Sequence, residues 1–336
     1  MHGPSTAPVA LLFGLLALPL SAADSSPPPA HKVTLQGDKL TPAAAARAIR
    51  EQASIDVDVA ALDATKTFNL NVQKADFWSA VQHLAAKTDS KVVTTGGRVA
   101  LKPGNSLAPM FVSGPFRFTV REVYARIDPE TGKSGYEVTL EVCWEPSLLA
   151  YRIDSSPTIA KATNDRGKDI VIRTGGSRAL TTGNLATLSV RPELGRGDKS
   201  ISVKGSVGVT IADKLLTFTF DANKPQPVPA QDGVTATVRK AGADGAHWFA
   251  EIEVKHAQGG VTVESHEYEL LRHNVARLIP PKGDPLPADL VEAADLRYGF
   301  KNRAMQVGPG WKLEYRTPGP MREIVVPFEL KDIPLP

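Results

Sequence analysis

The sequence predicts a chain of several domains: a small α+β domain built from two strand–helix–strand units (βαβ-βαβ), followed by two all-β sandwich domains. The 336 residues are enough for two or three domains of ordinary size. Helical and strand patterns alternate only within residues 33–104, whereas residues 110–336 show short apolar and polar alternations separated by turns. Gly and Pro, at 27 each, favour many turns and therefore short strands.

An apolar stretch, PVALLFGLLALPL at 8–20, comes first in the chain. It is too short for a membrane-spanning helix, which needs about 20 residues, and the small residues Ser21-Ala22-Ala23 follow it. This arrangement predicts a signal peptide, residues 1–23, cleaved near Ala23. The alternative is a packed N-terminal helix, which Pro8 and Pro19 disfavour. Residues 24–32 are then a proline-rich linker, and we expect a periplasmic or secreted protein whose mature chain has no transmembrane span.

The first strand–helix–strand unit begins with a short strand at Val33–Leu35. Thr41-Pro42 is typical of a helix N-cap followed by proline at the first helical position. The sequence AAAARAIREQA that follows has an amphipathic helical pattern. Alternation at 55–59 then predicts a half-buried strand.

The second unit repeats this pattern about 35 positions later. Phe68 and Leu70 take the positions of the first strand, and Asp76 takes the position of the N-cap. Gly96-Gly97 predicts a hairpin that joins two further strands, 91–93 and 98–102. Because neither unit alone covers its apolar face, we expect the two to fold together as helices over one small sheet.

These segments, VTLQGDKLTPAAAARAIREQASIDVDV, TFNLNVQKADFWSAVQHLAAKT and KVVTTGGRVALKP, resemble the short N-terminal domain shared by secretins and TonB-dependent signal-transducing receptors. The resemblance covers residues 33–102, about a fifth of the chain. It implies a periplasmic module that acts through protein–protein contact and has no catalytic residue. On this basis we expect residues 33–102 to bind a partner protein of the cell envelope.

Residues 110–224 are expected to form the first sandwich. Alternation at 116–121 and at 136–144 predicts two strands joined by a turn, and four further strands are predicted before residue 221. That number in about 115 residues is typical of an immunoglobulin-like sandwich. After a second proline-rich linker at 224–228, residues 229–336 are interpreted as another β-rich sandwich domain, and whether it duplicates the first is left open. Its last apolar segment, Glu323–Leu335, is either a core strand, which we favour, or an exposed strand for a partner.

Composition and motifs favour neither catalysis nor nucleic-acid binding. A net charge of +3 provides no strong basic field, and the single cysteine, Cys143, cannot form a disulfide within the chain. No HExxH, GxSxG, Walker or GxGxxG motif occurs. Glu141 and Glu145 share the predicted strand face of Cys143, so we expect them to raise the pKa of its thiol. We therefore expect no catalytic residue, no metal site and no cofactor.

The sequence thus predicts an exported, non-enzymatic envelope protein that acts as a protein–protein binding or scaffold module through residues 33–102. One alternative is an extracellular hydrolase with its site between the β-domains, near Glu145, His247 and Trp311. Another is a carbohydrate-binding protein that uses Trp144, Trp248 or Trp311 as its binding surface. A deep cleft with titratable groups would favour the first alternative, and exposed indoles would favour the second. The partner, the oligomeric state and the domain orientation are left open.

Overall fold

The computed structural model describes residues 25–127, 130, 134–175, 178–180, 183–194, 197–256, 274–292, 296–303 and 306–336. The predicted signal peptide lies outside these residues. Neither of the described helices has the length and apolar character that crossing a membrane requires.

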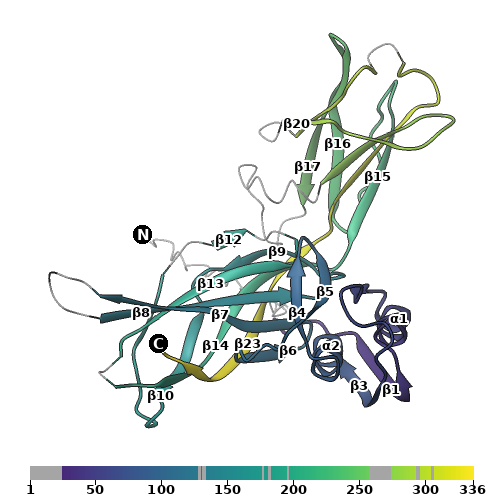
Figure 1. The fold of residues 1–336 in the computed structure, drawn as a ribbon. Coiled ribbons are helices and arrows are strands. Elements are labelled where there is room, and N and C mark those ends of the chain that lie inside the picture. Colours follow the sequence, from purple (N-terminus) through teal and green to yellow (C-terminus); the bar gives the residue numbers. More distant parts are fainter. Residues whose placement is uncertain are drawn as a thin grey trace, which may run out of the picture.

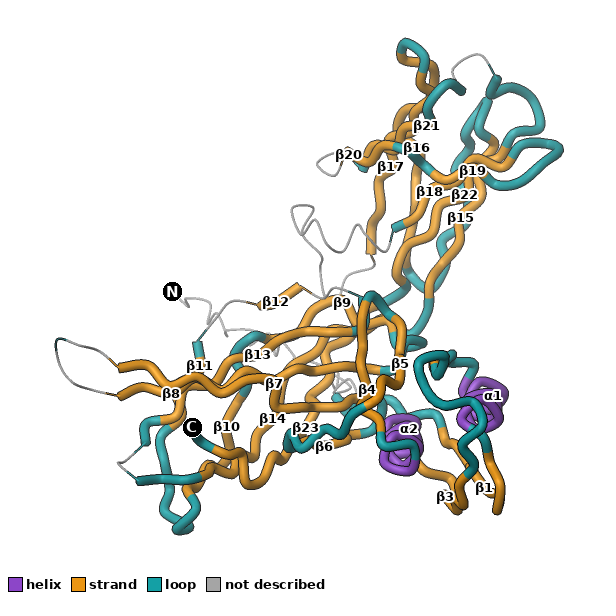
Figure 2. The backbone as a smooth tube through the Cα atoms, in the orientation of Figure 1, coloured by secondary structure: helices purple, strands orange, loops and turns teal. Residues whose placement is uncertain are grey.

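The described chain is mostly β, with 58% strand, 8% helix and six sheets. It forms three parts (Figure 1). The N-terminal module, residues 32–103, holds both helices. The body contains residues 110–212 and 321–334, and the distal unit, residues 215–318, projects away from the body (Figures 1 and 2).

The two helices of the module occur where the sequence predicts them. Helix α1 follows Thr41, whose hydroxyl accepts a hydrogen bond from Ala44 N at 3.2 Å, and it ends at Ser54 in the left-handed conformation. The Gly96-Gly97 hairpin is also confirmed, with positive φ at both glycines. The elements of the module are β1 (Lys32–Leu40), α1 (Pro42–Ala53), β2 (Val57–Asp58), β3 (Phe68–Asp76), α2 (Phe77–Lys87), β4 (Ser90–Thr95) and β5 (Arg98–Pro103).

The expectation of one small sheet under the helices is wrong. The module has two sheets: β1 and β3 pair antiparallel, and β2, β5 and β4 form a separate three-stranded sheet. One reason is the breadth of the apolar face of α2, which buries six residues: Phe77, Trp78, Ala80, Val81, Leu84 and Ala85. This face is wider than a single strand can cover, and here β3 and β4, from different sheets, both pack against α2.

The body is a pair of sheets around one apolar core. One sheet has the order β11-β13-β8-β7-β6, and the other is built on β14, which pairs with β10 and β9 along one edge and with β23 along the other. Its strands are β6 (Met110–Ser113), β7 (Phe116–Ile127), β8 (Ser134–Trp144), β9 (Leu149–Asp154), β10 (Thr158–Asn164), β11 (Ile172–Thr174), β12 (Arg178–Leu180), β13 (Leu185–Pro192), β14 (Ser200–Ala212) and β23 (Met321–Pro334).

The distal unit has its own core and two four-stranded sheets, with the orders β15-β22-β18-β19 and β16-β17-β21-β20. Its strands are β15 (Leu215–Asp221), β16 (Val234–Asp244), β17 (His247–His256), β18 (Val275–Ile279), β19 (Leu286–Pro287), β20 (Leu290–Glu292), β21 (Arg297–Phe300) and β22 (Lys312–Pro318).

The predicted fold class, a small α+β domain followed by two immunoglobulin-like sandwiches, is wrong. The last strand, β23, leaves the distal unit and pairs with β14 from Ser200↔Pro334 to Ala212↔Met321. Its side chains Ile324, Val326, Phe328, Leu330 and Ile333 lie in the core of the body. The distal unit is therefore inserted between β14 and β23. The apolar segment near the end is a core strand, as favoured, but alternation along a strand does not show which distant strand it pairs with.

Candidate functional site: the module and its junction with the body

Trp78 of α2 fixes the module to the body. Its indole is fully buried, and its Nε1 donates a hydrogen bond to Pro115 O at 2.9 Å. The guanidinium carbon of Arg117 lies 5.0 Å from the centre of the indole, within the range of a cation–π interaction. The ring of Phe77 meets the indole edge-on at 5.0 Å. One aromatic residue therefore joins α2 to the start of β7.

Arg117 connects this indole with Glu141 and Cys143 on β8. Its Nη2 lies 3.3 Å from Glu141 Oε1 and 3.9 Å from Cys143 Sγ. The pKa of Cys143 is raised to about 12: burial is the largest cause, Arg117 opposes the shift, and Glu141 adds to it. The expected upward shift is thus present, although burial is its main cause. Cys143 remains a thiol at neutral pH and packs in the core of the module.

A second link joins the start of β1 to the end of β8. The backbone N of His31 donates to Glu145 Oε1 at 3.2 Å, and His31 Nδ1 lies 2.5 Å from Glu145 Oε2. The carbonyl of His31 in turn accepts a hydrogen bond from Phe77 N at 2.9 Å. Glu145 is only 2% exposed. Burial raises the pKa of Glu145 above its ordinary value of 4.5, although His31 opposes this shift; the negative charge of Asp76 adds to it.

We predict that Glu145→Gln removes part of the pH dependence of stability. Because the pKa of Glu145 is raised on folding, its protonated form stabilises the folded state; this contribution is complete below pH 4.5 and is lost as the pH rises through the raised pKa. The melting temperature of the wild type minus that of the variant should therefore fall as the pH rises from 4.5, measured by calorimetry. Parallel pH profiles would show that Glu145 does not titrate in this way.

The segment predicted as a proline-rich linker lies against the body. The carbonyl of Ser25 accepts a hydrogen bond from Val325 N of β23 at 2.8 Å, and Arg322 Nη1 donates to Ser26 O at 3.3 Å. Ala30 is buried. With His31 held by Glu145, both ends of the described segment 25–31 are attached, so the module keeps a defined position on the body.

The structure does not bring the other candidate residues together. Trp144 is buried in the core of the body, Trp248 is buried in the core of the distal unit, and Trp311 packs partly buried against that second core. Glu145 is held by His31, and His247 lies opposite Asp244 at the hairpin of the distal unit. The indoles of Trp144 and Trp248 therefore present no flat face to a sugar.

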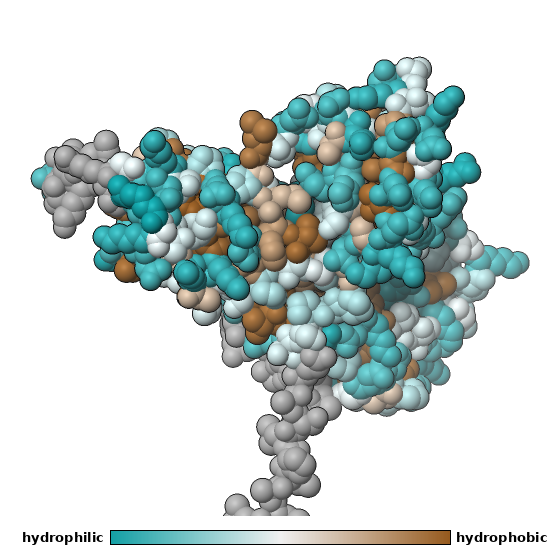
Figure 3. All heavy atoms as spheres, turned by 90° about the horizontal axis from the view of Figure 1, so that it is seen from below, coloured by the Kyte–Doolittle hydropathy of each residue, from teal (hydrophilic) through white to brown (hydrophobic). Residues whose placement is uncertain are grey.

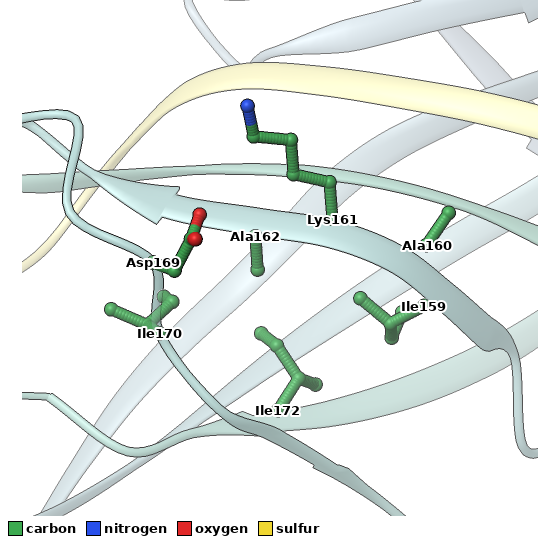
Figure 4. A pocket seen from close by; sticks show the side chains of 7 residues that line it. All are labelled: Ile159, Ala160, Lys161, Ala162, Asp169, Ile170 and Ile172. Atoms are coloured by element: carbon green, nitrogen blue, oxygen red, sulfur yellow. The ribbon is translucent and has the colours of Figure 1, made fainter.

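The groove in Figure 4 lies between β10 and residues 169–172 and has a volume of about 430 Å³. Ile159, Ala162 and two further isoleucines point into it, whereas Lys161 points to the other side of β10 (Figure 4). In a regular strand Ile159 and Lys161 would point to the same side. The register shift between them is a β-bulge, which places an extra residue there and turns Lys161 to the opposite side. A second cavity, of about 470 Å³, is lined by Asp56, Asp58, Arg98 and Pro146, among others. Neither set of lining residues contains a cysteine or a histidine.

Unlike these cavities, the outer edge of β3 offers backbone hydrogen-bonding groups. β3 pairs only with β1, and within the described residues no other element hydrogen-bonds to the backbone of Phe68–Val72. The side chains of Phe68, Leu70 and Val72 are 6–8% exposed, whereas Val33 and Leu35 on β1 are 0–1% exposed. This difference indicates that the apolar side chains between the β1–β3 sheet and the helices are less completely covered along β3 than along β1. Residues 67–73 contain no charge and no proline.

Two other long edge strands are blocked by partners within the chain. On β1, the amide of Gln52 occupies both backbone groups of Thr34, at 2.9 Å each, as a neighbouring strand would. On β23, Ser25 takes the N–H of Val325, and Pro327, two residues further along the same edge, has no N–H to offer. Neither edge is therefore free to pair over its full length.

The remaining long edge strands also have blocking features. The edge of β10 has a bulge and Lys161, and β16 has a register shift next to Arg239 and Lys240. On β15, Gln231 Nε2 donates to Thr217 O at 2.7 Å. Bulges, lysines and covering side chains are the usual means by which proteins prevent strand pairing at an edge. The stretch Phe68–Val72 itself has no lysine and no covering side chain. Its pairing with β1 shifts register between Gly37 and Leu40, where the extra residue is on β1, and again beyond Val72, next to Lys74.

Comparison of the chain with protein-family models, with curated proteins and with solved structures finds no match.

Figure 3 shows the molecule from below as largely hydrophilic, with apolar residues in separate patches. Within the described residues, no three His, Cys, Asp or Glu side chains are grouped so that they could hold a metal ion.

Proposed function

We propose that the protein is an exported, non-catalytic binding or scaffold protein of the cell envelope, and that its N-terminal module binds an extended segment of a partner protein. The partner segment adds as a third strand to the free edge of β3. The observation that supports this proposal best is the unblocked edge at Phe68–Val72, because an exposed strand edge is a template for another chain.

The chemistry of the edge indicates what kind of segment fits. Backbone groups of β3 supply the hydrogen bonds, and these are independent of the partner's sequence. Specificity comes from alternate side chains. Those on one side of the added strand extend the apolar layer of Leu70 and Val72 over the helices, and those on the other side lie beside the amides of Asn69 and Asn71. A partner strand that alternates apolar and uncharged polar residues satisfies both sides.

The proposal predicts that Asn71→Lys abolishes partner capture. A lysine on an exposed edge strand opposes the approach of another strand. Gln36→Lys is a matched control, because Gln36 lies directly opposite Asn71 on β1, and the amide of Gln73 donates to both side chains at 3.0 Å. Both variants add the same charge to the same face, but only Asn71 is at the free edge.

The measurement is affinity capture from an envelope extract with the full-length protein, followed by identification of the bound protein. We expect the wild type and Gln36→Lys to retain one specific protein and Asn71→Lys to lose it, with equal melting temperatures for all three. Retention of the same protein by Asn71→Lys would refute binding at β3.

A further inference from the structure

The outer face of the β4–β5 hairpin contains three exposed cations around a small apolar centre. Lys91 lies directly opposite Lys102, Val93 opposite Ala100, and Thr95 opposite Arg98. Side chains alternate along a strand, and Val99 and Leu101, which lie between these positions on β5, are buried in the core of the module. The cationic face, defined as Lys91, Val93, Arg98, Ala100 and Lys102, therefore points away from the helices.

The charges on this face are not neutralised. Like charges directly opposite each other in a sheet are destabilising, and Lys91 and Lys102 are such a pair. Within the described residues none of Lys91, Arg98 and Lys102 has an ion-pair partner. Four other cations of the module do, in the pairs Lys32–Asp76, Arg47–Glu51, Arg50–Asp56 and Lys66–Asp89. Lys39, Lys74 and Lys87 also have no ion pair within the described residues, but none of them lies opposite another cation in its sheet.

One carboxylate belongs to the same sheet. Asp58 of β2 lies opposite Ala100, and its Oδ1 accepts a hydrogen bond from Ala60 N at 2.9 Å. Asp56 and Asp58 line the same cavity as Arg98, and Asp56 is already paired with Arg50. Neither forms an ion pair with Lys91 or Lys102 within the described residues. The face thus keeps an excess positive charge that the chain does not neutralise.

We propose that the cationic face docks an acidic surface of a partner protein. Carboxylates of the partner neutralise Lys91 and Lys102 together, and this removes the repulsion between them. Val93 and Ala100, which are partly exposed, fit between the carboxylates as a flat apolar contact. A membrane surface fits less well, because the face has no aromatic or long apolar side chain to enter the lipid. This surface lies on the second sheet of the module and is independent of strand addition at β3.

The test uses the full-length protein and a labelled peptide of alternating glutamate and valine, with a lysine–valine peptide as the control probe. We expect the acidic peptide to bind, the basic peptide not to bind, and added salt to weaken the binding. Replacing two cations removes two surface ion pairs, so Lys91→Gln/Lys102→Gln should weaken binding about tenfold.

Two matched variants distinguish binding at this face from a general effect of net charge and from binding at β3. Lys282→Gln/Lys301→Gln makes the same change in net charge on the distal unit and should leave binding unchanged. Asn71→Lys should also bind the acidic peptide like the wild type, because it alters only the edge of β3. Equal loss in both double variants, loss in Asn71→Lys alone, or binding to phosphatidylglycerol vesicles without binding to the peptide would each overturn the proposal.

Discussion

Replacing Trp78 with alanine should lower the free energy of unfolding by about 4 kcal/mol, in the range of large-to-small changes in cores, and should loosen the module from the body. The substitution removes the largest buried side chain of α2. It also leaves Pro115 O without its hydrogen bond and Arg117 without the indole that it faces. The buried guanidinium keeps Glu141 at 3.3 Å but loses the aromatic ring on its other side, which adds to the cost.

Denaturant unfolding measures the loss of stability, and hydrogen exchange shows where it acts. We expect faster exchange in α2 and also in β7 and β8, because the indole connects them. Trp248→Ala is the control, since Trp248 is similarly buried but lies in the core of the distal unit. It should accelerate exchange in β17 and β21 only. If Trp78→Ala left exchange in β7 and β8 unchanged, the indole would not connect the module to the body.

Replacing Phe328 with alanine should also cost about 4 kcal/mol. Phe328 lies on β23, is buried in the core of the body, and stacks on Phe118 with ring centres 5.1 Å apart. Although this residue follows the distal unit in the sequence, its loss should destabilise the body. We expect faster exchange in β7 and β14 and no change in β16 and β17.

Phe218→Ala provides the control for this prediction. Phe218 is buried in the core of the distal unit and lies on β15, just after the chain leaves the body. Phe218→Ala should accelerate hydrogen exchange in β16 and β17 and leave exchange in β7 and β14 unchanged. If Phe328→Ala accelerated exchange in the distal unit and spared the body, β23 would belong to the distal unit and the observed pairing with β14 would be wrong.

Local features of the fold could be predicted from the sequence, because local interactions determine them. Thr41-Pro42 set the start of α1, the glycines at 96 and 97 set a hairpin, and alternation marked Phe116–Val120 as a strand. Sheet membership could not be predicted in the same way. Alternation in β23 shows that one face is buried, but the partner, β14, is more than 100 residues earlier in the chain.

For the candidate site, too, local features could be predicted from the sequence, whereas the positions of strands within sheets could not. Trp144 and Trp248 are candidate ligand platforms because sandwich domains often present aromatic side chains to a ligand. Tryptophan on a strand also fits a core, and the structure places both residues in cores. The absence of charge and proline from residues 67–73 was visible in the sequence. That these residues form an edge strand was not, because the edge position of β3 depends on which strands pair with it.

The most direct test of strand addition at β3 is hydrogen exchange of the full-length protein with and without its captured partner. Strand addition should give new protection within Phe68–Val72 on binding, because amides at a free edge gain acceptors from the added strand. Protection in β1, which is already paired, should stay unchanged. Protection that appears elsewhere while Phe68–Val72 continues to exchange as in the free protein would refute strand addition at β3.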